Sequence, residues 1–239
     1  LPNTIPKRKY ATRLWLGSSL PFMGVMVTSH LIAQSGLLAL GFYSDDEASA
    51  SFAAAMRIAD LCPLPLHVAN MALGPRFAAW TAPQLRRTVQ HVVSVWSGIA
   101  FVGVALPTIL LALYGDRVLS IVLPGAESAY PALIVIGCGH LGTASVGPAA
   151  YFLLMTGGHL PCLMCFACGA TISVVIAGLL TPLWGVCASA LATAAGLCVT
   201  HLLAAVIVRQ RSGIDCTILG AARVALRRYG VMMPTLPLR

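Results

Sequence analysis

Charged and titratable side chains interrupt a long apolar stretch of the sequence. Arg57, Asp60 and His67 lie within the segment 50–74, where most other residues are apolar or small. At about 100° per residue, an α-helix would place these three side chains in one sector of its surface. Guanidinium groups bind phosphate, carboxylates bind cations or protons, and imidazoles relay protons near neutral pH. The pattern therefore predicts a binding or proton-responsive site on one helix.

Two interpretations of Arg57 and Asp60 are open from the sequence. In the first, the two side chains form an i,i+3 ion pair that neutralises itself and fixes helix packing, or Arg57 snorkels outward. In the second, they line a substrate cavity in which Arg57 holds an anionic phosphate and Asp60 binds a cation or a proton. A lone charge at the centre of a bilayer costs at least about 2.5–3.5 kcal/mol, so both groups must be partnered or face a wet interior.

Other polar residues in the apolar blocks extend this candidate site. Two further histidines, His140 and His201, have no carboxylate near them in the sequence, and such lone histidines are more often part of hydrogen-bonded packing. No His-x-x-Glu-His spacing exists, so we predict no metal site. The candidate substrate-binding residues are Arg57, Asp60, His67, Asn70 and His30.

The cysteines and glycines point to no cofactor or catalytic motif. Cys162, Cys165 and Cys168 have a C-x2-C-x2-C spacing, but the fourth cysteine of an iron–sulfur run is absent and position 172 is isoleucine. We predict that these cysteines are small packing residues, and that the other five, which also fall in or near apolar blocks, form no disulfide framework. The sequence has no nucleophile elbow, phosphate loop or paired-carboxylate motif, and it predicts no cofactor and no enzymatic activity.

The composition places these groups in lipid. Of 239 residues, 58% are hydrophobic and 9% are charged, whereas soluble domains carry about 25% charged residues. The basic residues that give the net charge of +8 lie between apolar blocks, and this distribution argues against a nucleic-acid partner. A spanning helix needs roughly 20 apolar residues. We therefore predict an all-α membrane protein with six transmembrane helices, at about 14–42, 50–74, 90–114, 129–155, 160–182 and 185–208.

The charges between the blocks orient the chain. The two terminal tails and the loop after the second block hold 13 of the 15 lysines and arginines. The loop after the first block is acidic (45–47), and Asp116, Arg117 and Glu127 are predicted to lie in the loop after the third. The positive-inside rule then places both termini in the cytoplasm.

The chain divides into three parts. Residues 1–13 are predicted to form a basic cytoplasmic tail, 14–209 a six-helix transmembrane lobe, and 210–239 a second basic cytoplasmic tail. Apolar residues recur at helical spacing between 218 and 226, beside arginines. This spacing fits an amphipathic helix on the anionic leaflet, and a disordered basic tail is equally compatible.

Prolines and small residues predict kinked, closely packed helices. Proline removes a backbone hydrogen bond, and interrupted helices are common in transporters. The fourth block is the clearest case, because Gly147 precedes Pro148 there. In the sixth block, Ala188, Ala192 and Gly196 form a small-xxx-small ridge that allows close helix approach. The prolines within or at the edges of the blocks are Pro21, Pro63, Pro65, Pro107, Pro148 and Pro161.

Four stretches together resemble the C-terminal half of bacterial polysaccharide flippases of the multidrug/oligosaccharidyl-lipid/polysaccharide exporter superfamily. They are Ala-Ala-Met-Arg57-Ile-Ala-Asp60-Leu with Gly74-Pro75-Arg76-Phe77-Ala78, residues 113–119, residues 147–157, and residues 182–194, which open with Pro-Leu-Trp-Gly. The resemblance covers roughly residues 10–210. It implies one lobe of a two-lobed transporter around a central cavity, with an N-terminal six-helix lobe missing from this chain.

The resemblance also implies a function. It implies flipping of a lipid-linked oligosaccharide or polysaccharide precursor of the polyprenyl pyrophosphate type across the bacterial inner (plasma) membrane by alternating access, with Arg57 on the pyrophosphate. The implied partners are this lipid, the surrounding membrane lipids and the missing lobe. One alternative is a cation-coupled multidrug efflux transporter, with Asp60 as the coupling site and Arg57 pairing it. Another is an integral-membrane glycosyl-lipid transferase or polymerase, which would require catalytic carboxylates or a large external loop.

Overall fold

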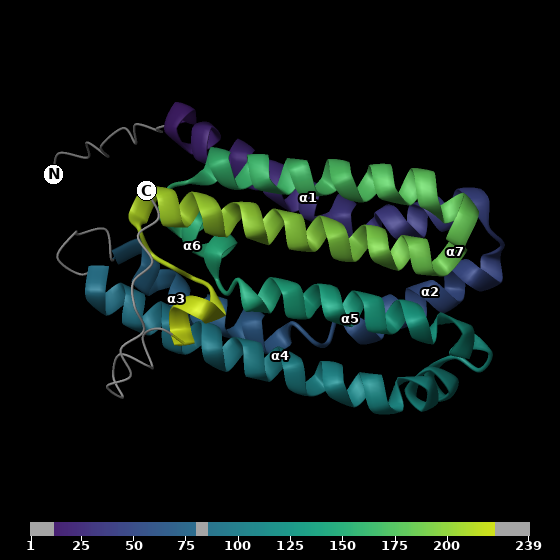
Figure 1. Cartoon of the computed structure of the whole chain (residues 1–239). Coiled ribbons are helices and arrows are strands. Elements are labelled where there is room, and N and C mark those ends of the chain that lie inside the picture. Colours follow the sequence, from purple (N-terminus) through teal and green to yellow (C-terminus); the bar gives the residue numbers. More distant parts are fainter. Residues whose placement is uncertain (1–11, 80–85, 223–239) are drawn as a thin grey trace, which may run out of the picture.

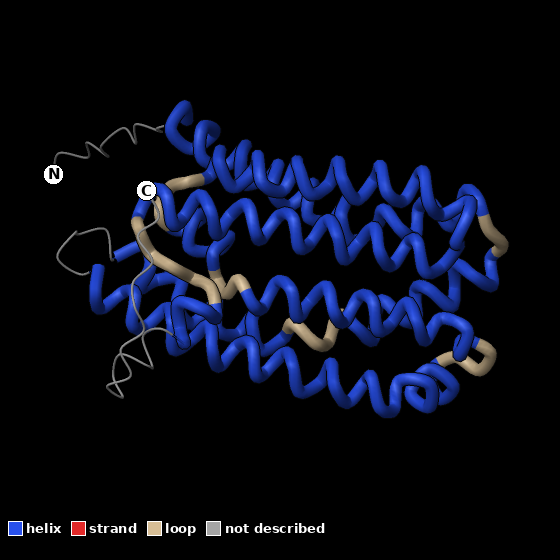
Figure 2. Tube along the Cα trace, in the orientation of Figure 1, coloured by secondary structure: helices blue, strands red, loops and turns tan. Residues whose placement is uncertain are grey.

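The protein is a bundle of helices. The computed structural model describes residues 12–79 and 86–222, of which 90% are helical and none lies in a strand. Figure 1 and Figure 2 show the helices packed side by side along one long axis. They are α1 (Thr12–Tyr43), α2 (Asp46–Ala59), α3 (Leu64–Ala79), α4 (Arg86–Val122), the short 3-10 helix η2 (Ala126–Ala129), α5 (Tyr130–Ser145), α6 (Ala149–Met155) and α7 (His159–Ser212).

Several of these helices are long and apolar enough to cross a membrane. Three single helices meet that condition, over Ser19–Tyr43, Arg86–Val122 and His159–Ser212. Two bent pairs also meet it, α2 with α3 at 49° and η2–α5 with α6 at 53°, which gives up to five candidates. The predicted all-α class and several of its apolar spanning helices are therefore present, and the predicted second and fourth blocks are each broken near a proline.

Helix α7 reverses direction within itself. Gly185 has φ 53° and ψ −128°, a conformation that breaks the helix and that glycine adopts without steric penalty. Ser173 donates to the Ala192 carbonyl oxygen at 2.9 Å, and the Thr181 and Ser189 hydroxyl oxygens lie 3.0 Å apart. The two halves of α7 therefore pack against each other, as the green and yellow ribbons of Figure 1 show.

Small residues allow this close approach. Ala188 and Ala192 are fully buried, and a Cβ on Gly196 would lie 2.9 Å from the Gly169 carbonyl oxygen of the other half. The predicted ridge of small residues is therefore confirmed. Helix α1 packs along α7, where the Ser35 hydroxyl lies 2.6 Å from that of Ser173.

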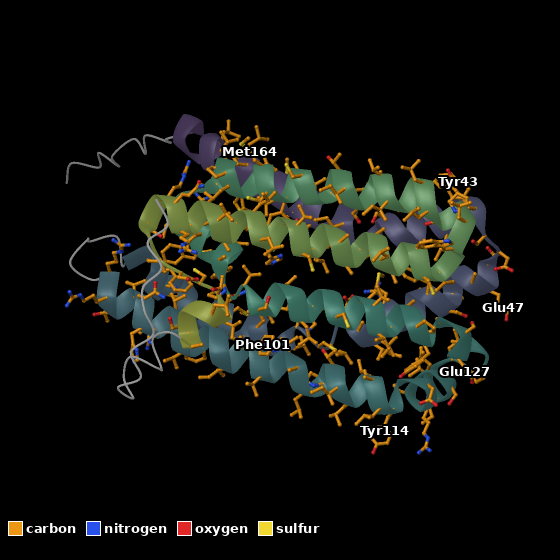
Figure 3. All side chains as sticks on the ribbon, in the orientation of Figure 1. Tyr43, Glu47, Phe101, Tyr114, Glu127 and Met164 are labelled. Carbon is orange, nitrogen blue, oxygen red and sulfur yellow. The ribbon has the colours of Figure 1, made fainter. Side chains whose placement is uncertain are left out.

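The connections that were predicted to be acidic gather at one end of the bundle. Figure 3 places Tyr43, Glu47, Tyr114 and Glu127 at that end, and Figure 1 shows that α1 begins and α7 ends at the other. One boundary prediction is wrong, because α4 continues to Val122 and the residues 116–117 are helical rather than in a loop. Packing against α5 extends the helix, since Leu119 is fully buried.

The residues that follow α7 belong to the core. Ile214 and Cys216 are buried, and the Gln90 side chain both donates to and accepts from the Asp215 backbone at 2.8 Å. Ser97 donates to the Cys216 carbonyl oxygen at 2.9 Å. Residues 213–217, here called the C-terminal strap, are therefore not the start of a free tail. A helix covers 218–222, and the rest of the predicted amphipathic segment lies outside the described residues.

The strap predicts an unreactive thiol. Burial, and to a lesser extent the charge of Asp215, raises the pKa of Cys216 to about 12. Because thiolate is the reactive form, N-ethylmaleimide at pH 7 should leave Cys216 unlabelled in folded protein and label it fully in detergent-denatured protein, as read by mass spectrometry.

A hydroxyl variant tests whether the strap causes this protection. Ser97→Ala removes the hydrogen bond to the Cys216 carbonyl, worth about 0.5–1.5 kcal/mol, so labelling should accelerate several-fold. Ser120→Ala is the matched control, because within the described residues the Ser120 hydroxyl donates only to the Arg117 carbonyl of its own helix. Equal labelling rates in the two variants would show that the strap does not depend on Ser97.

Candidate functional site

The candidate site forms where α2 and α3 meet at a break. Asp60 is the C-terminal cap of α2, and its backbone N–H reaches the Met56 carbonyl at 2.9 Å. Pro63 cannot donate a backbone hydrogen bond and disfavours a helical conformation for the residue before it. The chain therefore makes a turn before α3 begins at Leu64, and the two helices meet at 49°.

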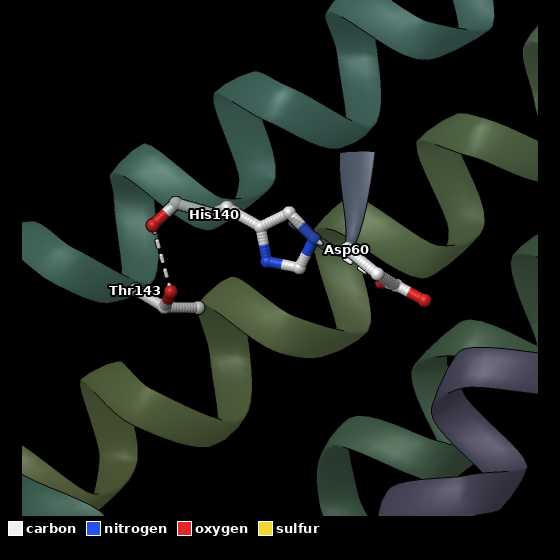
Figure 4. Close-up of polar contacts among 3 residues, drawn as sticks. All are labelled: Asp60, His140 and Thr143. Carbon is white, nitrogen blue, oxygen red and sulfur yellow. Dashed lines mark hydrogen bonds and ion pairs between the residues drawn. The ribbon is translucent and has the colours of Figure 1, made fainter. Parts of the chain in front are cut away.

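Asp60 faces a histidine from another helix. The His140 Nε2 lies 3.5 Å from the Asp60 Oδ1, and the exposed fractions of the two side chains are 9% and 48%. Figure 4 shows the imidazole of α5 directed at the carboxylate, with Thr143 donating to the His140 backbone carbonyl at 2.7 Å. The pair joins the α2–α3 break to the middle of α5.

The Nε2 atom of His140 is close to Asp60 but is not hydrogen-bonded to it. The buried Nε2 of His140 makes no hydrogen bond to any described residue, and 3.5 Å exceeds the usual 2.7–3.2 Å hydrogen-bond range. The contact is an ion pair only when His140 is protonated. A small approach of Asp60 would convert this contact into a hydrogen bond.

Two further histidines lie within electrostatic range of the pair. His67 of α3 interacts with His140 and Asp60, and His201 of α7 interacts with His140 and His67. The Nδ1 of His201 is 3.1 Å from the Leu197 carbonyl oxygen. We call Asp60, His67, His140 and His201 the Asp–His cluster. It draws its members from the α2–α3 break, α3, α5 and α7.

Arg57 does not pair with Asp60. Its side chain is exposed, and within the described ranges no carboxylate lies at ion-pair distance from it. The interpretation of Arg57 and Asp60 as a self-neutralising ion pair is therefore wrong. Asp60 caps the helix at the break and contacts α5 instead, whereas Arg57 remains on the last turn of α2.

The other two predicted binding residues are placed differently from the cluster. Asn70 is half-buried on α3, and its Oδ1 is a buried acceptor without a hydrogen-bond partner in the described part of the chain. His30 is exposed on α1, and no hydrogen bond or ion pair joins it to the described cluster residues. Asn70 thus keeps an unused acceptor, while His30 stands apart.

Sequence reasoning missed two members of the cluster. No carboxylate lies near His140 in the sequence, but the fold brings Asp60 to it from another helix. His201 likewise joins through tertiary packing. One feature of the sequence could have indicated the pairing. Four histidines lie in apolar blocks, and an isolated polar group in lipid requires a partner, which one of the seven acidic residues can supply.

No metal site accompanies the cluster. Within residues 12–79 and 86–222, no group of three or more His, Cys, Asp or Glu side chains is arranged to hold a metal ion. The predicted packing role fits Cys162 and Cys165, which are buried, whereas Cys168 is exposed. An imidazole beside a carboxylate is able to exchange protons, and an exposed guanidinium is able to bind an anion.

The chain was compared with known protein families, curated proteins and solved structures. No protein-family model, curated protein or solved structure matches the chain.

Proposed function

We propose that this chain is one lobe of a transporter of the bacterial polysaccharide flippase type. It moves a lipid-linked oligosaccharide or polysaccharide precursor from the cytoplasmic to the outer leaflet by alternating access. The observation that carries the proposal is Arg57, an exposed guanidinium with no carboxylate partner among the described residues. It lies one turn from the Asp–His cluster at the break of an apolar span.

The helix arrangement supports six spans. Each half of α7, over 159–184 and 186–212, exceeds the roughly 20 residues that a bilayer requires. Counting these halves separately, together with α1, α4 and the two bent pairs, gives six crossings. An even number returns both termini to one side, and the basic tails support the proposal that this side is the cytoplasm, as in a bacterial inner-membrane protein.

The chemistry of Arg57 favours a diphosphate-bearing lipid. A guanidinium donates two parallel hydrogen bonds to phosphate oxygens, and an uncompensated charge in the membrane is costly. A lipid-linked pyrophosphate supplies the missing anion while its tail stays in the bilayer. The unused Asn70 acceptor on α3 is suited to a sugar hydroxyl.

The site also favours flipping over the two alternatives. Multidrug efflux with Asp60 as the coupling site requires Arg57 to pair with Asp60, and that pair is not formed. A transferase or polymerase requires a large external segment. The connections between α1 and α2, and between α4 and η2, are only two and three residues long, over 44–45 and 123–125.

A second lobe completes the proposed transporter. Arg57 and His67 are exposed and Asp60 is half-exposed in this chain, so they would face lipid unless another protein or the substrate covered them. We assign this cover to a six-helix partner lobe, with the cavity between the lobes. The surrounding membrane lipids solvate the remaining apolar surface.

A leaflet assay tests the proposal. Membrane vesicles from cells that make the full protein, and from cells that lack it, are loaded with a polyprenyl-pyrophosphate oligosaccharide carrying a fluorescent sugar. Loss of fluorescence to a membrane-impermeant quencher reports arrival at the far leaflet. The protein should accelerate arrival at least tenfold. Equal rates in the two preparations, or export of a cationic dye in place of the lipid, would refute the assignment.

A further inference from the structure

We propose that the C-terminal strap is a latch on the two bent spans. While it is docked on α4 it holds their inner halves, α3 and α6, in place, and its release frees them to move. The inner halves lie on the side of each break toward the end where α1 begins and α7 ends. The latch stands on the contacts of the strap alone, whereas its role in transport rests on the proposed function.

One face of α4 holds the strap. Arg86, Gln90 and Ser97 are spaced so that, at about 100° per residue, they lie within about 40° of one another around the helix. The Arg86 guanidinium donates to the Gly213 carbonyl oxygen at 2.9 Å, and Gln90 and Ser97 bond the strap backbone as described above. Figure 1 shows the strap, in yellow, crossing from the end of α7 to α4. Because each hydrogen bond makes only a modest net contribution, the strap can detach while α4 stays folded.

The strap also contacts the break between α5 and α6. Gly147 has φ +66°, and a Cβ there would overlap the Cys216 carbonyl oxygen and the Ser97 hydroxyl, so the backbone of the break lies directly against the strap. Pro148 lacks a backbone N–H, and this absence interrupts the ladder of the span at the break. The bend of 53° at this break therefore cannot change freely while the strap is docked.

The inner halves of the two bent spans form one packed unit. Helix α3 packs against α6, where the rings of Phe77 and Phe152 meet edge to face with their centroids 5.0 Å apart. Ile214 and Cys216 of the strap belong to the same buried apolar cluster as these two phenylalanines. A movement of α6 at its break therefore takes α3 with it, and α3 turns at the α2–α3 break.

The latch acts at the end of the bundle that faces the cytoplasm in the proposed transport cycle. Helix α3 carries Asn70 and begins beside the Asp–His cluster, so its position determines access to the candidate site from that end. Docking of the strap stabilises the closed arrangement. Its release lowers the free energy needed to open the cytoplasmic end.

Hydrogen–deuterium exchange of the full protein in lipid nanodiscs tests the latch without any substrate. Gln90→Ala removes both hydrogen bonds to Asp215, and among the described residues Gln90 has no hydrogen bond to α3, α5 or α6. We expect exchange at the strap to accelerate at least about fivefold, and exchange in α6 and α3 to accelerate with it, while α2 and α5 stay unchanged. Faster exchange in the strap alone, or in no segment, would overturn the latch. Equal acceleration in α2 and α5 would show general destabilisation and would also overturn it.

Two further variants make the exchange experiment specific. Gln34→Ala is the matched control, because Gln34 is also a half-buried glutamine and makes none of the strap's hydrogen bonds in the described structure. It should leave exchange in the strap, α3 and α6 unchanged. Ser97→Ala removes a different bond of the strap and should reproduce the pattern of Gln90→Ala. The Gln90→Ala pattern in Gln34→Ala, or its absence from Ser97→Ala, would count against the latch.

The role of the latch in transport is tested in the leaflet assay. Gln90→Ala should speed arrival of the lipid-linked sugar at the far leaflet at least about twofold relative to the unmodified protein, because cytoplasmic opening requires less free energy. An unchanged or slower rate would overturn this role. If the unmodified protein moves no lipid-linked sugar, the proposed function fails, and the exchange experiment still decides whether the strap is a latch.

Discussion

Arg57→Ala should reduce translocation of a polyprenyl-pyrophosphate oligosaccharide by about 10- to 100-fold. Hydrogen bonds to charged groups contribute roughly 1.5–3 kcal/mol, and each 1.4 kcal/mol is tenfold. Arg57 is exposed, has no carboxylate partner among the described residues, and lies one turn from the cluster. Its removal therefore takes away substrate contact without leaving a buried acid unpaired, and the leaflet assay measures the loss directly.

Two companion variants make this prediction specific. Arg57→Lys keeps the charge but loses the planar two-pronged donor, so it should retain an intermediate rate. Arg117→Ala removes an exposed arginine of α4 at the far end of the bundle and should leave the rate unchanged. Full translocation by Arg57→Ala, or an equal loss in Arg117→Ala, would exclude Arg57 from phosphate binding. Expression and melting temperature are compared across the three variants to separate binding from folding.

The features that the sequence predicted correctly depend on local chemistry. Pro63 predicts the α2–α3 break because it lacks a backbone donor, and Gly147 with Pro148 predicts the α5–α6 break for the same reason. Pro21 and Pro107, in contrast, lie inside continuous helices. A proline therefore indicates a position where one backbone hydrogen bond of the helix is missing, and tertiary packing decides whether the helix bends there.

The features that the sequence did not predict depend on contacts between distant segments. His140 and Asp60 belong to different helices, and only the packing of α5 beside the α2–α3 break reveals their pairing. The same holds for the strap. Ile214 and Cys216 follow the basic end of α7, so the sequence predicts that they belong to the tail, whereas the structure buries them against α4. Local spacing contains no information on such contacts.

Gly147→Ala should be strongly destabilising. Gly147 has φ +66°, and a Cβ there would overlap the Cys216 carbonyl oxygen and the Ser97 hydroxyl. The left-handed conformation costs a residue with a Cβ about 1–2 kcal/mol, and overpacking adds about 1–3 kcal/mol. Because the carbonyl belongs to the strap, relief requires that the strap or the α5–α6 break move. Thermal unfolding in detergent should show a melting temperature several degrees below that of the unmodified protein.

Gly125→Ala separates the two costs. Gly125 also has a left-handed conformation, with φ +94°, but a Cβ there would meet no atom within 4 Å. It therefore incurs the backbone penalty without the overlap, and the difference between the two variants measures how rigidly the strap is held against the break. Equal melting temperatures would show that the strap yields at little cost. A larger loss in Gly147→Ala, accompanied by N-ethylmaleimide labelling of Cys216, would show that the strap leaves the core because the break no longer accommodates it.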